Sequence, residues 1–210
     1  TKKGKVVLVK NFDEKHIRAV MKLPLVRATL IRKQSLVAVV DGVNSVGGVA
    51  IPKLLKSLGV RVIEINCKPT GRFAHVAEPL PENLGELGIA VKKHKADLGI
   101  AVDPDADRLI FFDERGECVG EEYTLVLAAD YVLSKRQGST VSNLSSSRAL
   151  ADLAHSHRGN YFSSAVGLVH VVAEMKKRKA LIGGEGNGGV IYAPLHYGRD
   201  SLVGVALVLS

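Results

Sequence analysis

Apolar residues recur along the chain in short blocks with two different spacings. Residues 36–40 form a continuous run of apolar and β-branched residues, which is typical of a strand that is covered on both faces, and residues 60–66 are expected to form the next strand. Between them, residues 52–58 carry three leucines at helical spacing, and Gly59 follows as a natural stop. A strand, a helix and a strand in this order predict a βαβ unit with two parallel strands.

The same pattern continues on both sides of this unit. Residues 1–35 are basic and mixed, and the pattern predicts a helix there over 13–21 only. Residues 67–81 carry three prolines and are expected to form a long loop. The other expected helices lie over 82–94, 121–135, 147–155, 169–178 and 201–209, and the other strands over 97–102, 109–112, 139–144, 160–163, 180–182 and 190–193.

Two successive stretches repeat the order of strand, polar or glycine-rich loop, and helix. We therefore predict an α/β fold of two similar domains, each a mixed, mostly parallel sheet sandwiched by helices. A turn over residues 113–116 closes the first unit, which places the domains at 1–117 and 118–210. The chain starts without Met and stops within an apolar run, so we expect both ends to be cut from a longer protein.

Composition and charge narrow the class of protein. Hydrophobic residues make up 46% and charged residues 24%, ordinary values for a globular chain. There is no apolar run of about 18 residues for a membrane span, and no secretory signal core. The spacing of Cys67 and Cys118 predicts reduced thiols and a cytoplasmic protein. The net charge of +8 favours anionic ligands, but the lack of Trp and of a recognisable motif argues against nucleic acid.

Three aspartates alternate in residues 103–108, the aspartate loop, between two expected strands. Asp103, Asp105 and Asp107 stand two residues apart, so a curved loop can bring their carboxylates to one point. Three anions so close repel one another unless a cation offsets them, and ligands of oxygen alone suit Mg²⁺, Ca²⁺ or Mn²⁺. Arg108 follows directly, and its planar guanidinium suits a phosphate.

Two other interpretations of these aspartates are weaker. An EF-hand begins with the same alternation and has an acid at its twelfth position, as Glu114 is here. Its sixth position requires Gly, however, where this chain has Arg108, and the flanking segments look like strands rather than helices. A solvated acidic turn is the other alternative, and three carboxylates in strict alternation between apolar strands disfavour it.

Residues 183–189, the glycine loop, hold five glycines in seven positions. They match G-x-G-x-x-G, but a strand-like segment ending in Pro194 follows where a dinucleotide-binding fingerprint requires a helix. Such a loop lets a ligand approach the backbone, and Glu185 and Asn187 supply a carboxylate and an amide suited to sugar hydroxyls. A plain tight turn is the alternative.

Three further polar segments carry weaker signals. Residues 42–48 lack the lysine of a P-loop and fit a strand-to-helix turn, and residues 145–148 fit a helix cap. His196, Arg199 and Asp200 form a polar patch, in which Arg199 either contacts a phosphate or pairs with Asp200. The lone histidines are expected to be surface or hydrogen-bonded groups: His16, His75, His94 and His157.

The two loops together resemble one enzyme family, the α-D-phosphohexomutases. The aspartate loop, Asp-Pro-Asp-Ala-Asp-Arg, resembles the family's D-G-D-G/A-D-R metal loop, and the glycine loop resembles its sugar-binding loop, usually G-E-x-S-G-H. From about Ser35 the resemblance covers nearly the whole chain. Supporting pieces follow in the family's order: Val40-Asp41-Gly42, Gly47-Gly48, Phe73, Glu78 to Leu84, Val166-Gly167 with Met175, and Arg199-Asp200.

This resemblance implies a four-domain enzyme, of which the chain holds the second and third domains. The missing first domain would carry a catalytic phosphoserine, and the missing fourth would clamp the substrate phosphate. The implied reaction interconverts hexose 1-phosphate and hexose 6-phosphate through a bisphosphate. The implied roles are Mg²⁺ binding by Asp103, Asp105 and Asp107, phosphate contact by Arg108 as the catalytic residue, and substrate binding by Glu185, Asn187 and Arg199.

Several positions depart from the family pattern and leave the substrate open. Asn187 stands where Ser is usual, and Gly189 where His is usual. Ala165 and Leu168 replace a lysine and an acid around the Val-Gly pair. Glucose, mannose and glucosamine phosphates all remain candidates, and we expect no turnover from this fragment alone. The alternative function is a non-catalytic basic module that binds sugar phosphates or other anions.

Overall fold

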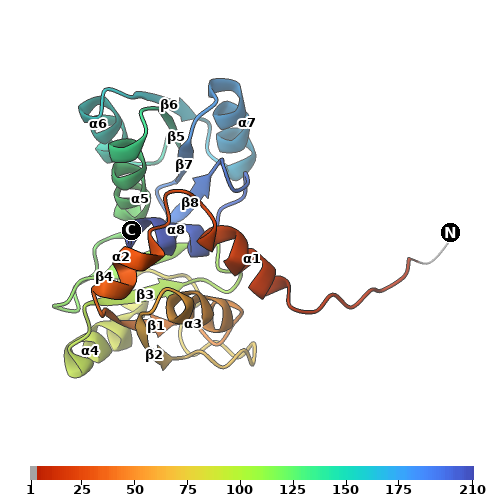
Figure 1. Ribbon diagram of the computed structural model, residues 1–210, viewed down its shortest axis with the longest axis vertical. Helices are drawn as coiled ribbons and strands as arrows, with labels where there is room; N and C mark the ends of the chain where they lie inside the picture. The colour runs from red at the N-terminus through yellow and green to blue at the C-terminus, as the bar shows by residue number, and fades with distance from the viewer. Residues whose placement is uncertain (1–3) are drawn as a thin grey trace.

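The computed structural model describes residues 4–210. One four-stranded sheet forms the centre of the lower half of the molecule in Figure 1. The strand order is β2-β1-β3-β4. β1 runs parallel to both of its neighbours, whereas β4 is antiparallel to β3. The strands are β1 (Val37–Asp41), β2 (Arg61–Ile65), β3 (Leu98–Val102) and β4 (Leu109–Phe112).

A second sheet repeats this arrangement in the upper half of the molecule (Figure 1). Its order is β6-β5-β7-β8, again with one antiparallel edge strand, β8. The prediction of two similar α/β units with mixed, mostly parallel sheets is therefore confirmed. The strands are β5 (Ser139–Asn143), β6 (Asn160–Ser164), β7 (Ile182–Glu185) and β8 (Gly189–Tyr192).

Helices cover both faces of each sheet, which explains the apolar runs of the central strands β1 and β3 in the first sheet. In β1, Ala38 and Val40 pack in one buried cluster with α3, while Val39 faces the cluster of α4 on the other side. Side chains alternate across a strand, so burial on both faces favours apolar residues at successive positions. The helices are α1 (Phe12–Met21), α2 (Ala28–Lys33), α3 (Gly47–Ser57), α4 (Gly85–His94), α5 (Glu121–Lys135), α6 (Ala149–Ser156), α7 (Leu168–Arg178) and α8 (Ser201–Val208), with a short 3₁₀ turn at Pro81–Asn83.

Three boundaries differ from the sequence predictions. α2 was not predicted, because Ile31 is its only buried residue and leaves no periodic signal. α3 begins at Gly47 rather than at residue 52, since the glycines let its first turn approach other backbone; a Cβ on Gly48 would lie 2.6 Å from the Cα of Cys67. The strand predicted over 180–182 runs instead through Gly183 and Gly184 to residue 185, so the glycine loop is a β-hairpin.

One buried cluster joins the two units. It includes apolar residues of α1, α3 and β1 from the first unit and of α5, β8 and α8 from the second. Figure 1 shows α8 between the two sheets, and its residues from 201 to 207 are all buried. The division at residue 117 stays a prediction. Within residues 4–210, no helix combines the length and the apolar character that a membrane span requires.

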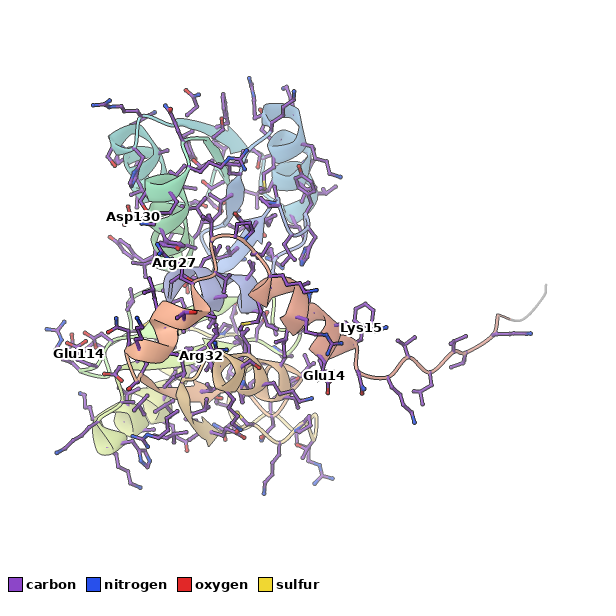
Figure 2. All side chains as sticks on the ribbon, in the orientation of Figure 1. Glu14, Lys15, Arg27, Arg32, Glu114 and Asp130 are labelled. Atoms are coloured by element: carbon purple, nitrogen blue, oxygen red, sulfur yellow. The ribbon has the colours of Figure 1, made fainter. Side chains whose placement is uncertain are left out.

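Charged side chains cover the outside of this core. Figure 2 shows Glu14 and Lys15 on the outer side of α1 and Glu114 in the turn after β4, and all three are exposed. Residues 4–10 leave the body as an extended segment, drawn at the right in Figure 1. The polar groups of interest lie instead at the junction of the units, where the carboxyl ends of β3 and β7 meet.

Candidate metal and sugar-phosphate site

The aspartate loop curls tightly at the carboxyl end of β3. The buried carboxylate of Asp103 accepts hydrogen bonds from the backbone N–H groups of Asp107 and Arg108, both at 3.0 Å, through Oδ1. The N–H of Ala106 also bonds to the carbonyl of Asp103. As a result, one carboxylate oxygen each from Asp103, Asp105 and Asp107 lies within 4.8 Å of the others. The three side chains therefore converge, as the alternation requires for a metal site.

The electrostatics of this loop suit a hard divalent cation. Burial raises the pKa of Asp103 to about 6, and the negative charges of Asp107 and Asp105 add to the shift against the two backbone hydrogen bonds. The Oδ1 atom of Asp107 is buried and has no hydrogen-bond partner among residues 4–210. A buried acceptor without a partner is costly, and a cation would satisfy it. Oxygen ligands of this kind fit Mg²⁺.

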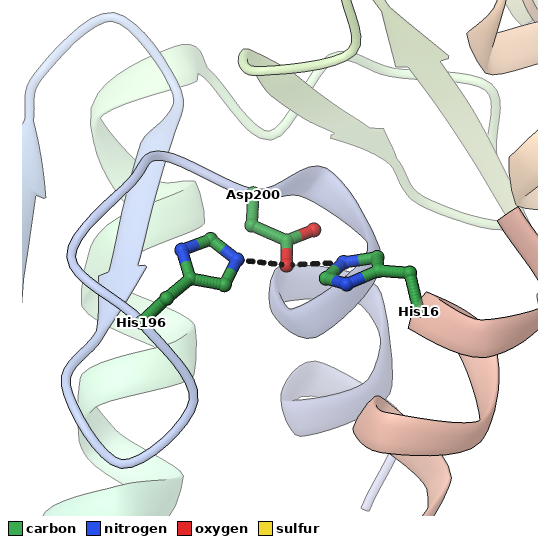
Figure 3. Close-up of side chains that lie close together, drawn as sticks. All are labelled: His16, His196 and Asp200. Carbon is green, nitrogen blue, oxygen red and sulfur yellow. Dashed lines mark hydrogen bonds and ion pairs between the residues drawn. The ribbon is translucent and has the colours of Figure 1, made fainter. Parts of the chain in front are cut away.

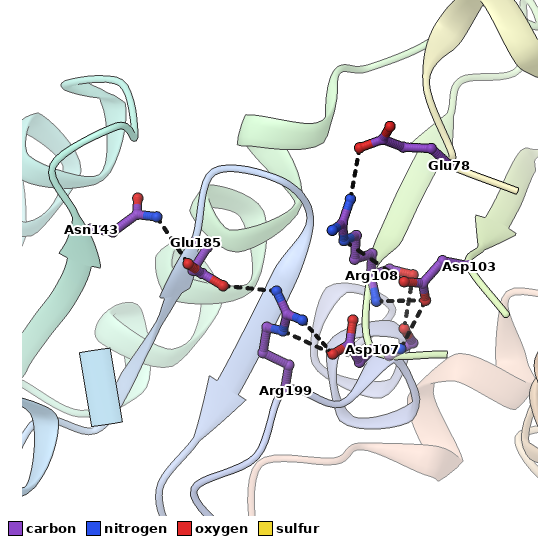
Figure 4. A network of polar contacts seen from close by, with 8 residues as sticks. Glu78, Asp103, Asp107, Arg108, Asn143, Glu185 and Arg199 are labelled. Atoms are coloured by element: carbon purple, nitrogen blue, oxygen red, sulfur yellow. Dashed lines mark hydrogen bonds and ion pairs between the residues drawn. The ribbon is translucent and has the colours of Figure 1, made fainter. Parts of the chain in front are cut away.

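Arg108 ends the aspartate loop and reaches the long loop before α4. Its Nη1 donates to Oε1 of Glu78 at 2.9 Å, and its Nε lies 3.7 Å from Oδ2 of Asp103. Glu78 thus fixes the guanidinium from a segment far away in sequence (Figure 4). Sequence reasoning did not select Glu78 as a site residue, although it belongs to the stretch 78–84 that resembles the family.

The glycine loop holds its carboxylate from two sides. Glu185 ends β7 and is buried. Its Oε1 accepts a hydrogen bond from Nδ2 of Asn143 at 3.0 Å, and its Oε2 accepts one from Nη1 of Arg199 at 2.7 Å. Asn143 ends the neighbouring parallel strand β5, and sequence reasoning missed it. Its position could have indicated it, because the carboxyl ends of parallel strands meet at one edge of a sheet.

Arg199 connects the two loops across the junction of the units. Besides its bond to Glu185, its Nε donates to Oδ2 of Asp107 at 3.0 Å, and Nη2 donates to the same oxygen (Figure 4). Its side chain is 14% exposed, so these ion pairs lie largely away from water. Arg199 therefore pairs with two carboxylates distant in sequence and not with Asp200. Its contact with a phosphate stays a prediction.

Asn187 lies in the turn of the hairpin, beside a small cavity. Its Oδ1 is buried and has no hydrogen-bond partner among residues 4–210. The cavity has a volume of about 160 Å³ and is lined by the start of α5, the carboxyl end of β5 with the residues after it, and the glycine loop. Such a lining can exchange hydrogen bonds with hydroxyl groups. The lining residues are Glu121, Glu122, Asn143, Ser145, Gly186 and Asn187.

Comparison with known proteins identifies the family. Residues 14–116 match alpha/beta/alpha domain II of the phosphoglucomutase/phosphomannomutase family, and residues 120–210 match its alpha/beta/alpha domain III. The chain belongs to the phosphoglucomutase/phosphomannomutase family. The family predicted from the aspartate and glycine loops is thereby confirmed.

Two curated relatives illustrate the similarity. The chain is 36% identical over 182 residues to a phosphoglucomutase/phosphomannomutase of Thermococcus kodakarensis, covering 86% of this chain and 40% of that protein. It is 38% identical over 201 residues to a protein named probable phosphoglucosamine mutase of Pyrococcus abyssi, covering 95% of this chain and 43% of that protein. The chain thus spans about two fifths of the length of these relatives.

Solved structures of the family share the fold. A phosphoglucomutase/phosphomannomutase family protein from Burkholderia thailandensis superposes with a TM-score of 0.80 at 29% identity, over 94% of this chain and 43% of its own. The phosphoglucomutase parafusin from Paramecium superposes with a TM-score of 0.77 at 20% identity, over 93% of this chain and 37% of its own, and shows the fold alone. The arrangement of the two sheets is thus that of phosphohexomutases.

Proposed function

We propose that this chain forms the metal-binding and sugar-binding part of a phosphohexomutase. The whole enzyme would interconvert hexose 1-phosphate and hexose 6-phosphate through a phosphoserine and a bisphosphate. The observation that carries the proposal is the bridge made by Arg199, whose guanidinium joins Asp107 of the aspartate loop to Glu185 of the glycine loop. A metal site and a sugar site need this proximity if the metal is to offset the charge of a phosphoryl group that passes between the serine and the sugar.

Asp103, Asp105 and Asp107 are the residues that would hold Mg²⁺. The bound ion would neutralise the charge of the transferring phosphoryl group. Arg199 occupies Oδ2 of Asp107, while Oδ1 has no hydrogen-bond partner within residues 4–210, which keeps that oxygen available to the metal. Glu78 holds Arg108 through one N–H group of its guanidinium. The other N–H groups of Arg108 would donate to the phosphate.

Glu185 and Asn187 would bind the sugar hydroxyls. Each carboxylate oxygen of Glu185 accepts one hydrogen bond in the structure and has a second lone pair for a hydroxyl donor. Asn187 offers a buried acceptor with no partner among the described residues. Because several hydroxyls of a hexose can serve these acceptors, the sugar could bind in two orientations. In the first orientation, a sugar hydroxyl oxygen would take the phosphoryl group as its bond to the serine oxygen breaks, and the serine oxygen would gain the hydroxyl proton. In the second, the serine oxygen would take the other phosphoryl group of the bisphosphate, and the proton would pass back to the sugar oxygen.

The rest of the enzyme would come from other domains of the same protein. The phosphoserine domain and the domain that clamps the substrate phosphate are its proposed partners, and the fragment alone would be inactive. A cytoplasmic location fits the two free cysteines. Burial raises the pKa of the Cys67 thiol to about 12, so this thiol is unreactive and needs no disulfide partner.

Calorimetric titration with Mg²⁺ tests the metal site. We expect saturable binding to the chain, and no binding to the variant in which Asp103, Asp105 and Asp107 are all changed to Asn. Asp113→Asn is the matched control, since Asp113 lies in the turn after β4 and pairs with Arg115 instead. Equal Mg²⁺ binding by the wild type and the triple variant would refute the assignment.

An assay of the longer protein tests the reaction. We expect conversion of at least one of glucose, mannose or glucosamine 1-phosphate to its 6-phosphate, and a loss of at least about 100-fold in kcat/KM for Asp107→Asn. Saturable sugar-phosphate binding without any turnover would instead support the alternative, a non-catalytic binding module.

A further inference from the structure

A second polar cluster lies next to Arg199, at the contact of α1 with α8. Nε2 of His16 lies 2.8 Å from Oδ2 of Asp200, and Nε2 of His196 lies 3.1 Å from the same oxygen (Figure 3). The other oxygen of Asp200 accepts hydrogen bonds from the N–H groups of Leu202 and Val203 and thereby caps α8. Asp200 thus joins the first unit, the loop after β8 and the start of α8.

Two histidines and an aspartate could in principle bind a transition metal. The position of the ring proton of His196 indicates hydrogen bonds instead. The backbone N–H of Gly198 donates to Nδ1 of His196 at 2.9 Å, so that nitrogen carries no proton. The neutral ring of His196 therefore has its proton on Nε2 and donates it to Asp200. A metal would need Nε2 unprotonated. The cluster is therefore a hydrogen-bonded lock, which we call the histidine lock: His16, Asp200 and His196.

The residue that follows the histidine lock, Ser201, connects it to the aspartate loop. The N–H of Asp200 bonds to the carbonyl of Val190 at 2.9 Å, and the N–H of Ser201 bonds to the carbonyl of Ala106 at 3.2 Å. The hydroxyl of Ser201 also donates to the carbonyl of Arg108 at 3.1 Å. The backbone next to Arg199 is thereby fixed relative to both sheets.

The stem of Arg199 is confined as well. A Cβ on Gly189 would lie 2.4 Å from Cδ of Arg199, so the stem lies against the glycine loop. With its backbone held by Asp200 and its stem by Gly189, the guanidinium reaches Asp107 and Glu185 together. Loss of the histidine lock would leave the backbone of Arg199 less firmly held, while its stem would still lie against Gly189.

We propose that His16 and His196 are positioning residues that hold Arg199, through Asp200, between the aspartate loop and the glycine loop. The importance of this role for catalysis rests on the function proposed above, in which Arg199 orients Asp107 toward the metal. His16 has particular weight because it belongs to α1, so the lock also fixes α1 against the site (Figure 3).

Two measurements on His16→Leu test this proposal. Leu removes the donor, so we expect the Nε proton of Arg199 and the amide of Ser201 to exchange with water about tenfold faster by NMR, and Mg²⁺ affinity to fall about tenfold. His16→Gln keeps an N–H donor and should restore both quantities to within about twofold. His157→Leu is the matched control, because it breaks a histidine–aspartate pair with Asp130 elsewhere, and it should change neither.

A folded His16→Leu protein with unchanged Arg199 exchange and unchanged Mg²⁺ affinity would overturn the proposal. If that variant does not fold, His196→Leu gives the same test, since His196 lies on a partly exposed loop. Absence of Mg²⁺ binding by the wild type would count against the proposed metal site. The exchange of the Arg199 proton would then still decide whether the histidine lock holds that residue.

Discussion

Gly188 shows at the scale of one residue how closely the glycine loop approaches the first unit. Its φ is +90°, and its carbonyl accepts a hydrogen bond from the N–H of Leu109 at 3.0 Å. A Cβ at this position would lie 2.5 Å from the carbonyl oxygen of Leu109. Both the backbone conformation and the space therefore require Gly.

Gly188→Ala should lower the free energy of unfolding by about 2 kcal/mol or more, from backbone strain and from the clash with β4. Urea denaturation measures this change. Gly85→Ala is the control, because Gly85 begins α4 with open space around a Cβ, and it should leave stability unchanged or slightly raised. Equal stability of the two variants would contradict the close approach.

At the scale of elements, α1 and α8 depend on one carboxylate. Burial raises the pKa of Asp200, but the hydrogen bonds from His16 and His196 and the charge interactions with both rings together outweigh burial, so the pKa lies below its ordinary value. The hydrogen bond to Asp200 raises the pKa of His16, against a smaller opposing effect of burial. The contact between the helices therefore depends on pH.

The sign of that dependence follows from the two shifts. The stability from His16 is fully present below its unfolded pKa, about 6.5, and is lost as the pH rises through the raised value. The stability from Asp200 is present above about pH 4 and is lost as the pH falls through the lowered value. We expect His16→Gln to destabilise the protein more at pH 6 than at pH 8 in urea denaturation. A difference that is equal or larger at pH 8 would contradict this expectation.

At the scale of the whole molecule, the two sheets share one buried cluster. Val205, Ala206 and Leu207 of α8 are fully buried between them, and α5 packs in the same cluster. Burial of apolar surface is the main favourable contribution to folding, so each unit would expose its part of this shared cluster without the other.

We therefore expect one cooperative thermal transition, despite the two sheets. Differential scanning calorimetry should give equal calorimetric and van't Hoff enthalpies for the chain. Val205→Ala should move the whole transition to lower temperature, since a buried truncation costs about 1 kcal/mol or more. Two separate transitions, with only one displaced by Val205→Ala, would show that the units unfold independently.

The sequence by itself determined the local features of this protein. Apolar runs such as 36–40 reveal strands covered on both faces, because side chains alternate along a strand. The aspartate loop depends on residues only two positions apart, so their spacing alone predicts convergence. The family follows from the same two loops. These features need no knowledge of how the units pack together.

The tertiary structure decided which distant groups meet. Arg199 pairs with Asp107, which lies 92 positions away in the sequence, and Arg108 pairs with Glu78, which lies 30 positions away. Such pairs depend on how strand ends and loops pack, which no local spacing records. For the same reason two features were not predicted: α2, which has one buried residue, and the continuation of the strand predicted over 180–182 through Gly183 to Glu185. Local periodicity determines helices, strands and short loops, whereas packing determines the contacts between them. The bridge that Arg199 makes between the aspartate loop and the glycine loop is such a contact.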